Sequence, residues 1–177
     1  MKFCSNCAAP VVKRVPPGDS VPRWVCDSCG EIHYQNPLLV VGAIPEWEGR
    51  LLLCRRAIEP RYGYWTLPAG FMENDETAGQ AALRETLEEA GARIELLAAY
   101  SLISVPYVNQ VHLFYRARLL DLEFKPGAES LEVALFEEDK MPWKDIAFRT
   151  VGLTLRHWFA DRKTGAFGFH AEDVAPR

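Results

Sequence analysis

Stretches of apolar residues separated by polar turns run along this chain of 177 residues and predict its strands. Residues 38–44 form an unbroken apolar run, which is typical of a buried strand. Turn-forming residues at 45–49 separate it from a second apolar segment at 50–54, so we expect a β-hairpin. Further strands are expected at about 97–104, 110–119 and 132–136, and a C-terminal helix at 150–162. This order of elements predicts an α+β fold in which helices pack against a mixed sheet.

A second helix is predicted over residues 75–90. Asn74 is its expected N-cap, and the acidic residues that follow suit the positive end of the helix dipole. Gly91 is the expected terminator, because glycine readily adopts the left-handed conformation that ends many helices.

The two faces of this helix carry different side chains. Leu83, Leu87 and Ala90 fall within a sector of about 60°, which we expect to pack against the protein core. The opposite face spans about 100° and presents three carboxylates: Glu85, Glu88 and Glu89. Like charges at this spacing repel one another and destabilise the helix, and a bound cation would offset that repulsion. Because the ligand atoms would be carboxylate oxygens, the expected cation is Mg²⁺ or Mn²⁺. A solvated acidic face without a ligand is the alternative.

Four of the five cysteines form two Cys-x2-Cys pairs, Cys4 with Cys7 and Cys26 with Cys29, and 18 residues separate the pairs. This spacing predicts a structural Zn²⁺ held by four thiolates, with no open position for catalysis. Two disulfides are the alternative, but no export signal supports an oxidising compartment. Cys54 lies in an apolar segment and is expected to be a buried hydrophobic side chain.

Composition narrows the possible functions. Hydrophobic residues make up 49% of the chain and charged residues 25%, as in ordinary globular proteins. The formal net charge of −4 argues against a nucleic-acid-binding protein. The longest apolar run is far shorter than the roughly 20 residues that cross a bilayer, and residues 1–7 lack the apolar segment of a secretory signal. We therefore expect no nucleic-acid partner, no membrane partner and a cytoplasmic protein, with a ribbon at 1–35 and a larger domain at 36–177.

The segment around the predicted helix resembles the motif of a known family, the Nudix hydrolases. Their motif is Gly-x5-Glu-x7-Arg-Glu-U-x-Glu-Glu-x-Gly-U, in which U is a bulky aliphatic residue. Its fixed positions are filled here by Gly70, Glu76, Arg84, Glu85, Glu88, Glu89 and Gly91. The chain departs from the motif at the two U positions, which are Thr86 and Ala92. These are packing positions, so the departure concerns local packing and leaves the carboxylates intact.

The resemblance extends over most of the chain, about residues 3–170. The cysteine pairs, residues 34–37 and residues 64–71 look like those of the zinc-ribbon Nudix subgroup, which includes bacterial proteins similar to plant organellar FAD and ADP-ribose diphosphatases. The resemblance implies a Nudix α/β/α sandwich with a mixed sheet after a small zinc ribbon. The zinc-ribbon NADH diphosphatases carry a Ser-Gln-Pro-Trp-Pro-Phe-Pro motif that is missing from this sequence, which disfavours NADH as the preferred substrate.

The family resemblance also implies a mechanism. The three glutamates of the helix would hold Mg²⁺ or Mn²⁺, and the backbone carbonyl of Gly70 is a further candidate ligand. Arg84 would orient Glu85, and Glu76 would complete that arrangement. Glu132 is the candidate general base, and Glu73 and Glu89 are the alternatives.

The implied reaction is hydrolysis of a nucleoside diphosphate linked to another moiety, with FAD or ADP-ribose as substrate and AMP as one product. The alternative is a Nudix module that senses such a nucleotide metabolite without cleaving it. Arg55 and Arg56 end a predicted strand and are candidate phosphate ligands. Tyr64, Phe71 and Tyr107 are candidate platforms for a stacked ring. Relatives are often homodimers, so a homodimer is expected.

Overall fold

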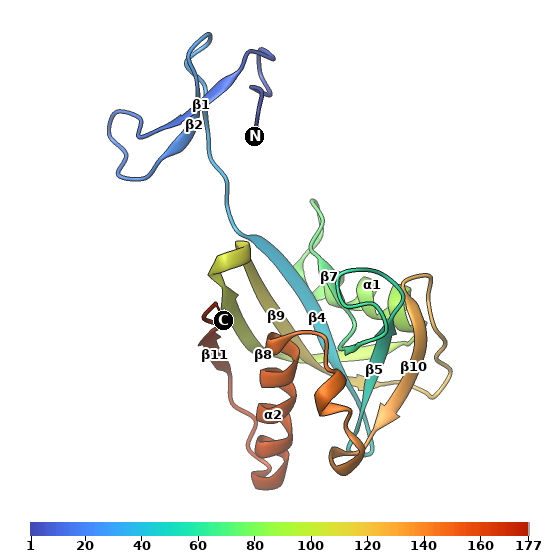
Figure 1. Cartoon of the computed structure of the whole chain (residues 1–177). Coiled ribbons are helices and arrows are strands. Elements are labelled where there is room, and N and C mark those ends of the chain that lie inside the picture. Colours follow the sequence, from blue (N-terminus) through green and yellow to red (C-terminus); the bar gives the residue numbers. More distant parts are fainter. Residues whose placement is uncertain (177) are drawn as a thin grey trace. The chain divides into compact units, whose positions relative to one another are not determined.

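The structure is a computed structural model, and it describes residues 1–176. Two compact units divide the chain, one from Met1 to Pro37 and the other from Leu38 onward (Figure 1). None of the helices in the described part of the chain is long and apolar enough to cross a membrane.

The N-terminal unit is a three-stranded antiparallel sheet with two cysteine turns. Its strands are β1 (Val11–Arg14), β2 (Arg23–Cys26) and β3 (Ile32–His33) in that order. In each turn a backbone N–H closes onto a cysteine carbonyl: Ala8 onto Cys4 and Gly30 onto Cys26, both at 2.9 Å. Gly30 has φ +76°, as expected for a glycine in such a turn.

The second unit contains one mixed sheet in the order β10-β5-β4-β9-β8-β11, and two short strands extend it, β6 beside β5 and β7 beside β4. β4 is parallel to β9, β11 is parallel to β8, and the other pairs are antiparallel. The strands are β4 (Leu38–Trp47), β5 (Arg50–Arg56), β6 (Trp65–Thr66), β7 (Ala69–Phe71), β8 (Ile94–Val105), β9 (Gln110–Leu119), β10 (Ser130–Phe136) and β11 (His170–Asp173). The helices are α1 (Ala78–Ala90), α2 (Arg149–Thr164) and the short 3₁₀ turns η1 (Pro106–Val108), η2 (Glu138–Lys140) and η3 (Trp143–Asp145).

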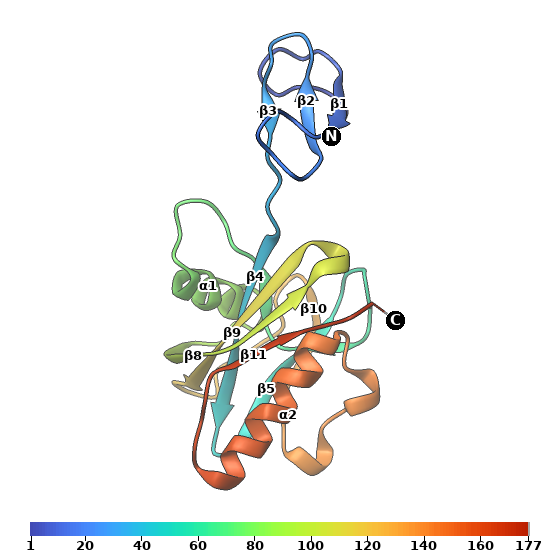
Figure 2. The same cartoon turned by 90° about the vertical axis from the view of Figure 1, so that its left-hand side faces the viewer.

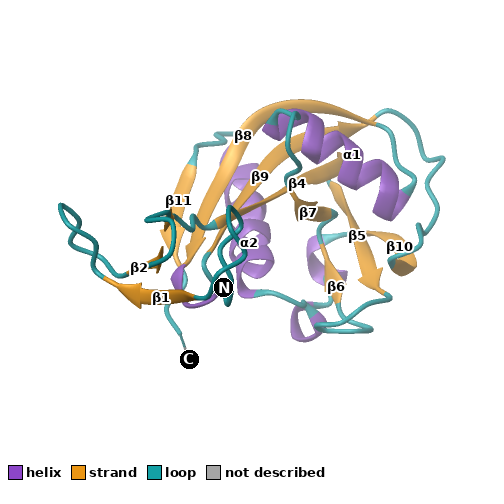
Figure 3. Cartoon of the chain, turned by 90° about the horizontal axis from the view of Figure 1, so that it is seen from above, coloured by secondary structure: helices purple, strands orange, loops and turns teal. Residues whose placement is uncertain are grey.

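Alternate residues of β4 and β5 point to opposite sides of the sheet and build two apolar layers. Ile44 and Leu53 join the cluster that packs under α2. Ala43 and Leu52 join a cluster on the other side, near the end of α1. The two helices therefore cover opposite faces (Figures 2 and 3), and the predicted α/β/α sandwich with a mixed sheet is confirmed.

The predicted β-hairpin is confirmed, although its first strand is longer than expected. β4 continues through Trp47, and Trp47 pairs with Arg50 across a two-residue turn. Both turn residues, Glu48 and Gly49, have positive φ, as a tight turn of this length requires. The strands predicted at 97–104, 110–119 and 132–136 and the helix predicted at 150–162 are present within slightly different bounds.

The start of α1 differs from the prediction. The N-cap is Thr77, whose hydroxyl accepts the N–H of Gln80, and the Gln80 side chain accepts the N–H of Thr77 in return. Asn74 lies outside the helix, because Asp75 has φ +66° and interrupts the helical conformation. The helix ends as predicted at Gly91, with φ +59°.

The packed face of α1 was predicted only in part, because Ala90 is buried as expected but the two leucines are not. Leu83 and Leu87 are 40% and 56% exposed, whereas Ala81, Ala82 and Thr86 are completely buried. Small side chains allow the helix to lie close to the sheet, and that same face carries Glu85 and Glu89 inward.

Candidate active site

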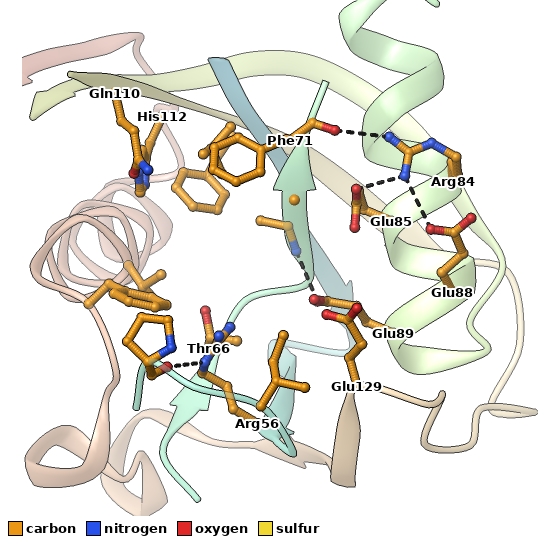
Figure 4. Close-up of a pocket in the computed structure, with 18 of the residues that line it drawn as sticks. Arg56, Thr66, Phe71, Arg84, Glu85, Glu88, Glu89, Gln110, His112 and Glu129 are labelled. Atoms are coloured by element: carbon orange, nitrogen blue, oxygen red, sulfur yellow. Dashed lines mark hydrogen bonds and ion pairs between the residues drawn. The ribbon is translucent and has the colours of Figure 1, made fainter. Parts of the chain in front are cut away.

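A pocket of about 870 Å³ lies in the second unit, within the size range of pockets that bind small molecules (Figure 4). Its residues come from α1, several strands, the segment before β10 and the first turn of α2. Glutamate side chains lie on one side: Glu85, Glu88, Glu89 and Glu129. Gln110 and His112 lie on the opposite side. The pocket thus has an acidic wall and a second wall that carries an amide and an imidazole.

The two inward-facing carboxyl groups of α1 are largely removed from solvent. Glu85 and Glu89 are only 9% and 8% exposed. Burial raises the pKa of Glu89 to about 8, although its Oε2 accepts the N–H of Ala69 at 3.1 Å. Burial likewise raises the pKa of Glu85. These side chains therefore provide oxygen ligands whose charge a cation would stabilise.

Arg84 connects the acidic side chains around it. Its Nε and Nη2 donate to both oxygens of Glu76, at 3.1 and 2.7 Å. Its Nη1 donates to Glu85 at 2.7 Å and to Glu88 at 3.1 Å, and Nη2 also donates to the Phe71 carbonyl at 3.2 Å. The hydrogen bonds to Glu76 are the main reason that the pKa of Arg84 is raised. One guanidinium thus fixes two carboxylates of the acidic wall and ties α1 to the end of β7.

Gly70 allows the acidic wall to approach β7. A Cβ atom at position 70 would overlap the carboxylate of Glu85. This contact gives a physical reason for glycine at this position, next to the carboxylates.

The segment before β10 docks on the C-terminal end of α1 and brings in a further carboxylate. Gly127 donates its N–H to the Glu89 carbonyl at 3.0 Å, and Lys125 donates to the Ala90 carbonyl at 2.9 Å. A Cβ atom at Gly127 would overlap the backbone carbonyl of Glu88. The backbone carbonyl of Glu129, which lines the pocket, accepts the N–H of Ala57 at 2.8 Å. Glycine at 127 is therefore needed for this docking, which sets the backbone beside Glu129.

Several residues predicted from the sequence lie outside the pocket. Glu132 Oε2 is 3.6 Å from Arg55 Nη1, and the Glu132 side chain is 53% exposed. Arg55 Nε also donates to the Gly63 carbonyl at 2.9 Å. Tyr64 stacks under a guanidinium, and Tyr107 is half exposed in η1.

Other predicted residues do line the pocket. Phe71 is the last residue of β7, Glu73 follows this strand, and both line the pocket. Arg56 also lines the pocket, and its Nε donates to the Pro60 carbonyl at 2.9 Å. Its guanidinium lies 5.1 Å from the centre of the Phe148 ring. Arg56 therefore holds the loop that follows β5 and remains within reach of a ligand.

The second wall contains residues that the sequence did not single out. Gln110 and His112 are two positions apart on β9, so they share one face of the strand. His112 contacts Gln110 at 3.1 Å and Thr150 at 3.0 Å. Burial lowers the pKa of His112 to about 4, so the ring is neutral at pH 7. The i, i+2 spacing in a predicted strand was the available signal, but the sequence does not show which face of that strand borders a pocket.

A separate group of metal-ligand type lies in the N-terminal unit. The Sγ atoms of its four cysteines all lie within 4.8 Å of one another. Cys4 and Cys29 are 3.7 Å apart and Cys7 and Cys26 are 3.5 Å apart, which is too long for disulfide bonds. A tetrahedral ZnS₄ site with Zn–S bonds of about 2.3 Å has sulfur–sulfur distances of about 3.8 Å. The four thiols therefore fit Zn²⁺.

Comparison with known proteins agrees with this geometry. A family model described as "Nudix N-terminal", of zinc-ribbon type, matches residues 2–35. The NAD-capped RNA hydrolase NudC of Chromobacterium violaceum is 28% identical over 159 residues, which are 88% of this chain and 57% of that protein. The chain thus spans little more than half of this relative. The ADP-ribose pyrophosphatase of Methanocaldococcus jannaschii is 30% identical over 113 residues, covering 62% of this chain and 67% of that protein.

A solved structure matches over nearly the whole chain. The crystal structure of a NUDIX hydrolase from Nitrosomonas europaea is 54% identical, with a TM-score of 0.95, and the match covers 98% of this chain and 99% of that one. The NUDIX domain model matches residues 37–159, which include all of the pocket residues described above. The chain belongs to the Nudix family.

Proposed function

We propose that this protein hydrolyses the diphosphate bond of a nucleoside diphosphate linked to another moiety. ADP-ribose is the first substrate that we propose and FAD the second, with AMP and the other phosphate as products. The observation that carries this proposal is one pocket that has four carboxylates on one side and Gln110 and His112 on the other (Figure 4). The name of the Methanocaldococcus jannaschii relative supports ADP-ribose.

The proposal includes Mg²⁺ or Mn²⁺ held by Glu85, Glu88 and Glu89. The donor set consists of oxygen atoms, which these cations prefer, and they keep several water ligands, so the carboxylates need not surround the ion completely. A bound divalent cation would neutralise the diphosphate, polarise the phosphorus and activate water. Arg84 acts as a positioning residue, since it holds Glu85 and Glu88 by hydrogen bonds.

For the general base we propose Glu129 in place of Glu132. Glu129 lines the pocket, whereas Glu132 lies beside Arg55. In the hydrolysis step the oxygen of a water molecule forms a bond to phosphorus, the bridging P–O bond breaks, and the carboxylate takes the proton of the water. Comparison of Glu129→Gln with Glu132→Gln tests this choice: the first substitution should lower kcat at least about tenfold and the second less than about twofold.

The substrate is tested with the purified full chain. ADP-ribose, FAD, NADH and an NAD-capped RNA oligonucleotide are each incubated with Mg²⁺, with Mn²⁺ or with EDTA, and the released phosphates are identified. We expect AMP and ribose 5-phosphate from ADP-ribose, and no reaction with EDTA. The capped RNA is included because a relative that matches most of the chain is named a hydrolase of that substrate. If the protein binds one or more of these compounds but hydrolyses none of them, the proposal is contradicted and a sensing module is favoured.

A carboxylate variant tests the metal assignment. Glu88 is largely exposed, and we expect Glu88→Gln to lower kcat at least about a hundredfold while the unfolding midpoint stays unchanged. Titration with Mn²⁺, followed by its electron paramagnetic resonance signal, should show weaker binding. Full activity and unchanged Mn²⁺ affinity would refute Glu88 as a ligand.

The remaining parts of the proposal concern zinc, location and assembly. We propose that the four cysteines hold one structural Zn²⁺, because their sulfur atoms fit a tetrahedral site. A cytoplasmic location is consistent with free thiols. Sedimentation equilibrium would test the proposed homodimer.

A further inference from the structure

The wall opposite the carboxylates contains two polar side chains among apolar ones. Gln110 and His112 lie across the pocket from Glu88 and Glu89 (Figure 4). The surrounding lining is apolar or aromatic: Val40, Phe71, Phe114, Phe148 and Val151. Such a surface suits a planar ring more than a sugar rich in hydroxyl groups, whose polar atoms would lose their hydration without new partners.

Hydrogen bonds fix the orientation of the Gln110 amide. Its Oε1 lies 3.1 Å from His112 Nε2, and an amide oxygen can only accept, so His112 Nε2–H is the donor. His112 Nδ1 is then the acceptor for the hydroxyl of Thr150, at 3.0 Å. Thr150 is buried in the first turn of α2, which holds this chain of hydrogen bonds in place.

The amide of Gln110 therefore offers a defined pattern to the pocket. Its NH₂ group is a donor for which no acceptor is found in residues 1–176, and its oxygen keeps a second lone pair. A glutamine amide matches a ring edge that has an amino donor beside a ring-nitrogen acceptor, as adenine has at N6 and N7. Burial keeps His112 neutral at pH 7, so the wall adds no charge beside the ring.

We propose that Gln110, held by His112 and Thr150, binds the edge of the adenine ring of the substrate. The inference rests on the proposed function and extends it, because adenine is the part that ADP-ribose and FAD share. It makes Gln110 a specificity-determining residue, and it makes His112 and Thr150 positioning residues.

The test compares ADP-ribose with the analogue that has unsubstituted purine in place of adenine. The wild-type protein should prefer ADP-ribose by about tenfold in kcat/KM, the effect of one hydrogen bond. In Gln110→Leu the preference should fall to within about twofold, through a higher KM for ADP-ribose with nearly unchanged kcat. Gln35→Leu, at an exposed position outside the pocket, is the matched control and should keep the full preference.

A second variant separates positioning from general damage. Thr150→Val keeps the shape of the buried side chain but removes the hydroxyl that orients His112. The preference for adenine should fall to about threefold while kcat for ADP-ribose is retained. An undiminished preference in both Gln110→Leu and Thr150→Val would overturn the inference.

Binding measurements distinguish this inference from the proposed function. If ADP-ribose is not hydrolysed, the proposed function fails, and calorimetry with AMP and with purine riboside monophosphate still tests the ring site. Tighter binding of AMP to the wild-type protein, and equal binding of both to Gln110→Leu, would support the inference. A Gln110→Leu variant that loses affinity for FAD but not for AMP would place the flavin in the site and overturn the adenine assignment.

Discussion

The two units of the chain differ in what stabilises them. The N-terminal unit has a small core of Cys4, Val11 and Cys26, with Ala9 and Trp24 packed against it. The second unit buries eleven side chains in a single cluster, which includes the packed face of α2. A unit as small as the first buries too little apolar surface to fold by itself. Two of its core residues, Cys4 and Cys26, are proposed Zn²⁺ ligands, so the metal would supply folding energy that apolar packing does not. The second unit folds by apolar packing, and its carboxylates stay available on a pocket wall.

The two groups of metal-ligand type differ in the same way. The cysteine sulfur atoms close around one point, as a structural Zn²⁺ site requires. The glutamates are spread along a wall that is open to a pocket of about 870 Å³. A closed site gives folding energy, and an open site leaves room for water and substrate. The two units should therefore respond independently to substitution.

The largest effect is expected in the N-terminal unit. Cys26→Ser should abolish stoichiometric zinc binding and unfold residues 1–37, because metal binding supplies most of the folding free energy of such a unit. Metal analysis and NMR spectra of the full chain measure this effect, and the unfolding midpoint of the second unit should not change. Cys54→Ala is the matched control: Cys54 is buried in the second unit, so zinc content should stay at one per chain. Loss of zinc in both variants would contradict separate units.

The next effect concerns the segment docked on α1. Gly127→Ala should lower the free energy of unfolding of the second unit by about 3 kcal/mol, because a methyl group would overlap the Glu88 carbonyl. It should also lower kcat about tenfold through displacement of Glu129. Gly168→Ala is the control, since open space surrounds that position. Equal effects of the two substitutions on urea unfolding would refute this role of Gly127, and zinc content should be unaffected.

A smaller effect follows from the buried histidine. The pKa of His112 is about 4 in the folded protein and 6.5 ordinarily, so between these values the unfolded chain binds a proton that the folded chain does not. Stability is therefore lost as the pH falls from 6.5 towards 4, by about 2.5 kcal/mol at roughly pH 4.5. Urea unfolding at neutral and acidic pH should show a weaker pH dependence in His112→Gln. An identical slope in both proteins would argue against a neutral buried ring.

The smallest effect is expected on the outer face of α1. Leu87→Ala should change the free energy of unfolding by less than about 0.5 kcal/mol, because Leu87 is 56% exposed. Leu155→Ala makes the same chemical change at a fully buried position of α2 and should cost about 2–5 kcal/mol. Similar losses of unfolding free energy in the two variants would show that the face with Leu83 and Leu87 packs against the core, as the sequence predicted.

Both groups of metal-ligand type could be picked out because each follows a motif with fixed spacing along the chain. The cysteine spacing and the glutamate motif of one helix identify these side chains without knowledge of the fold. The inward face of α1 could not be inferred from hydrophobicity, because Ala81 and Ala82 pack as closely as leucines would and Glu85 points to the same side. Leucine spacing at Leu83 and Leu87 indicated the wrong face.

The far wall of the pocket was not predictable for a different reason. His112 and Thr150 are brought together by β9 and α2, which are distant in sequence. The position of Glu129 depends on a docking contact at Gly127, which no local sequence pattern predicts. Such sites are created by the tertiary fold, so they become visible only when the strands and helices are in place.

The origin of the two pocket walls bears on how this fold diversifies. The acidic wall depends on one helix, one arginine and two glycines, Gly70 and Gly127, at which a Cβ atom would overlap neighbouring atoms. The wall on β9 and α2 shares no hydrogen bond with Arg84 in the described chain. Effects of substitutions at unconnected positions are close to additive. Substitution along β9 can therefore alter ligand selection during evolution while the hydrolytic apparatus is inherited unchanged.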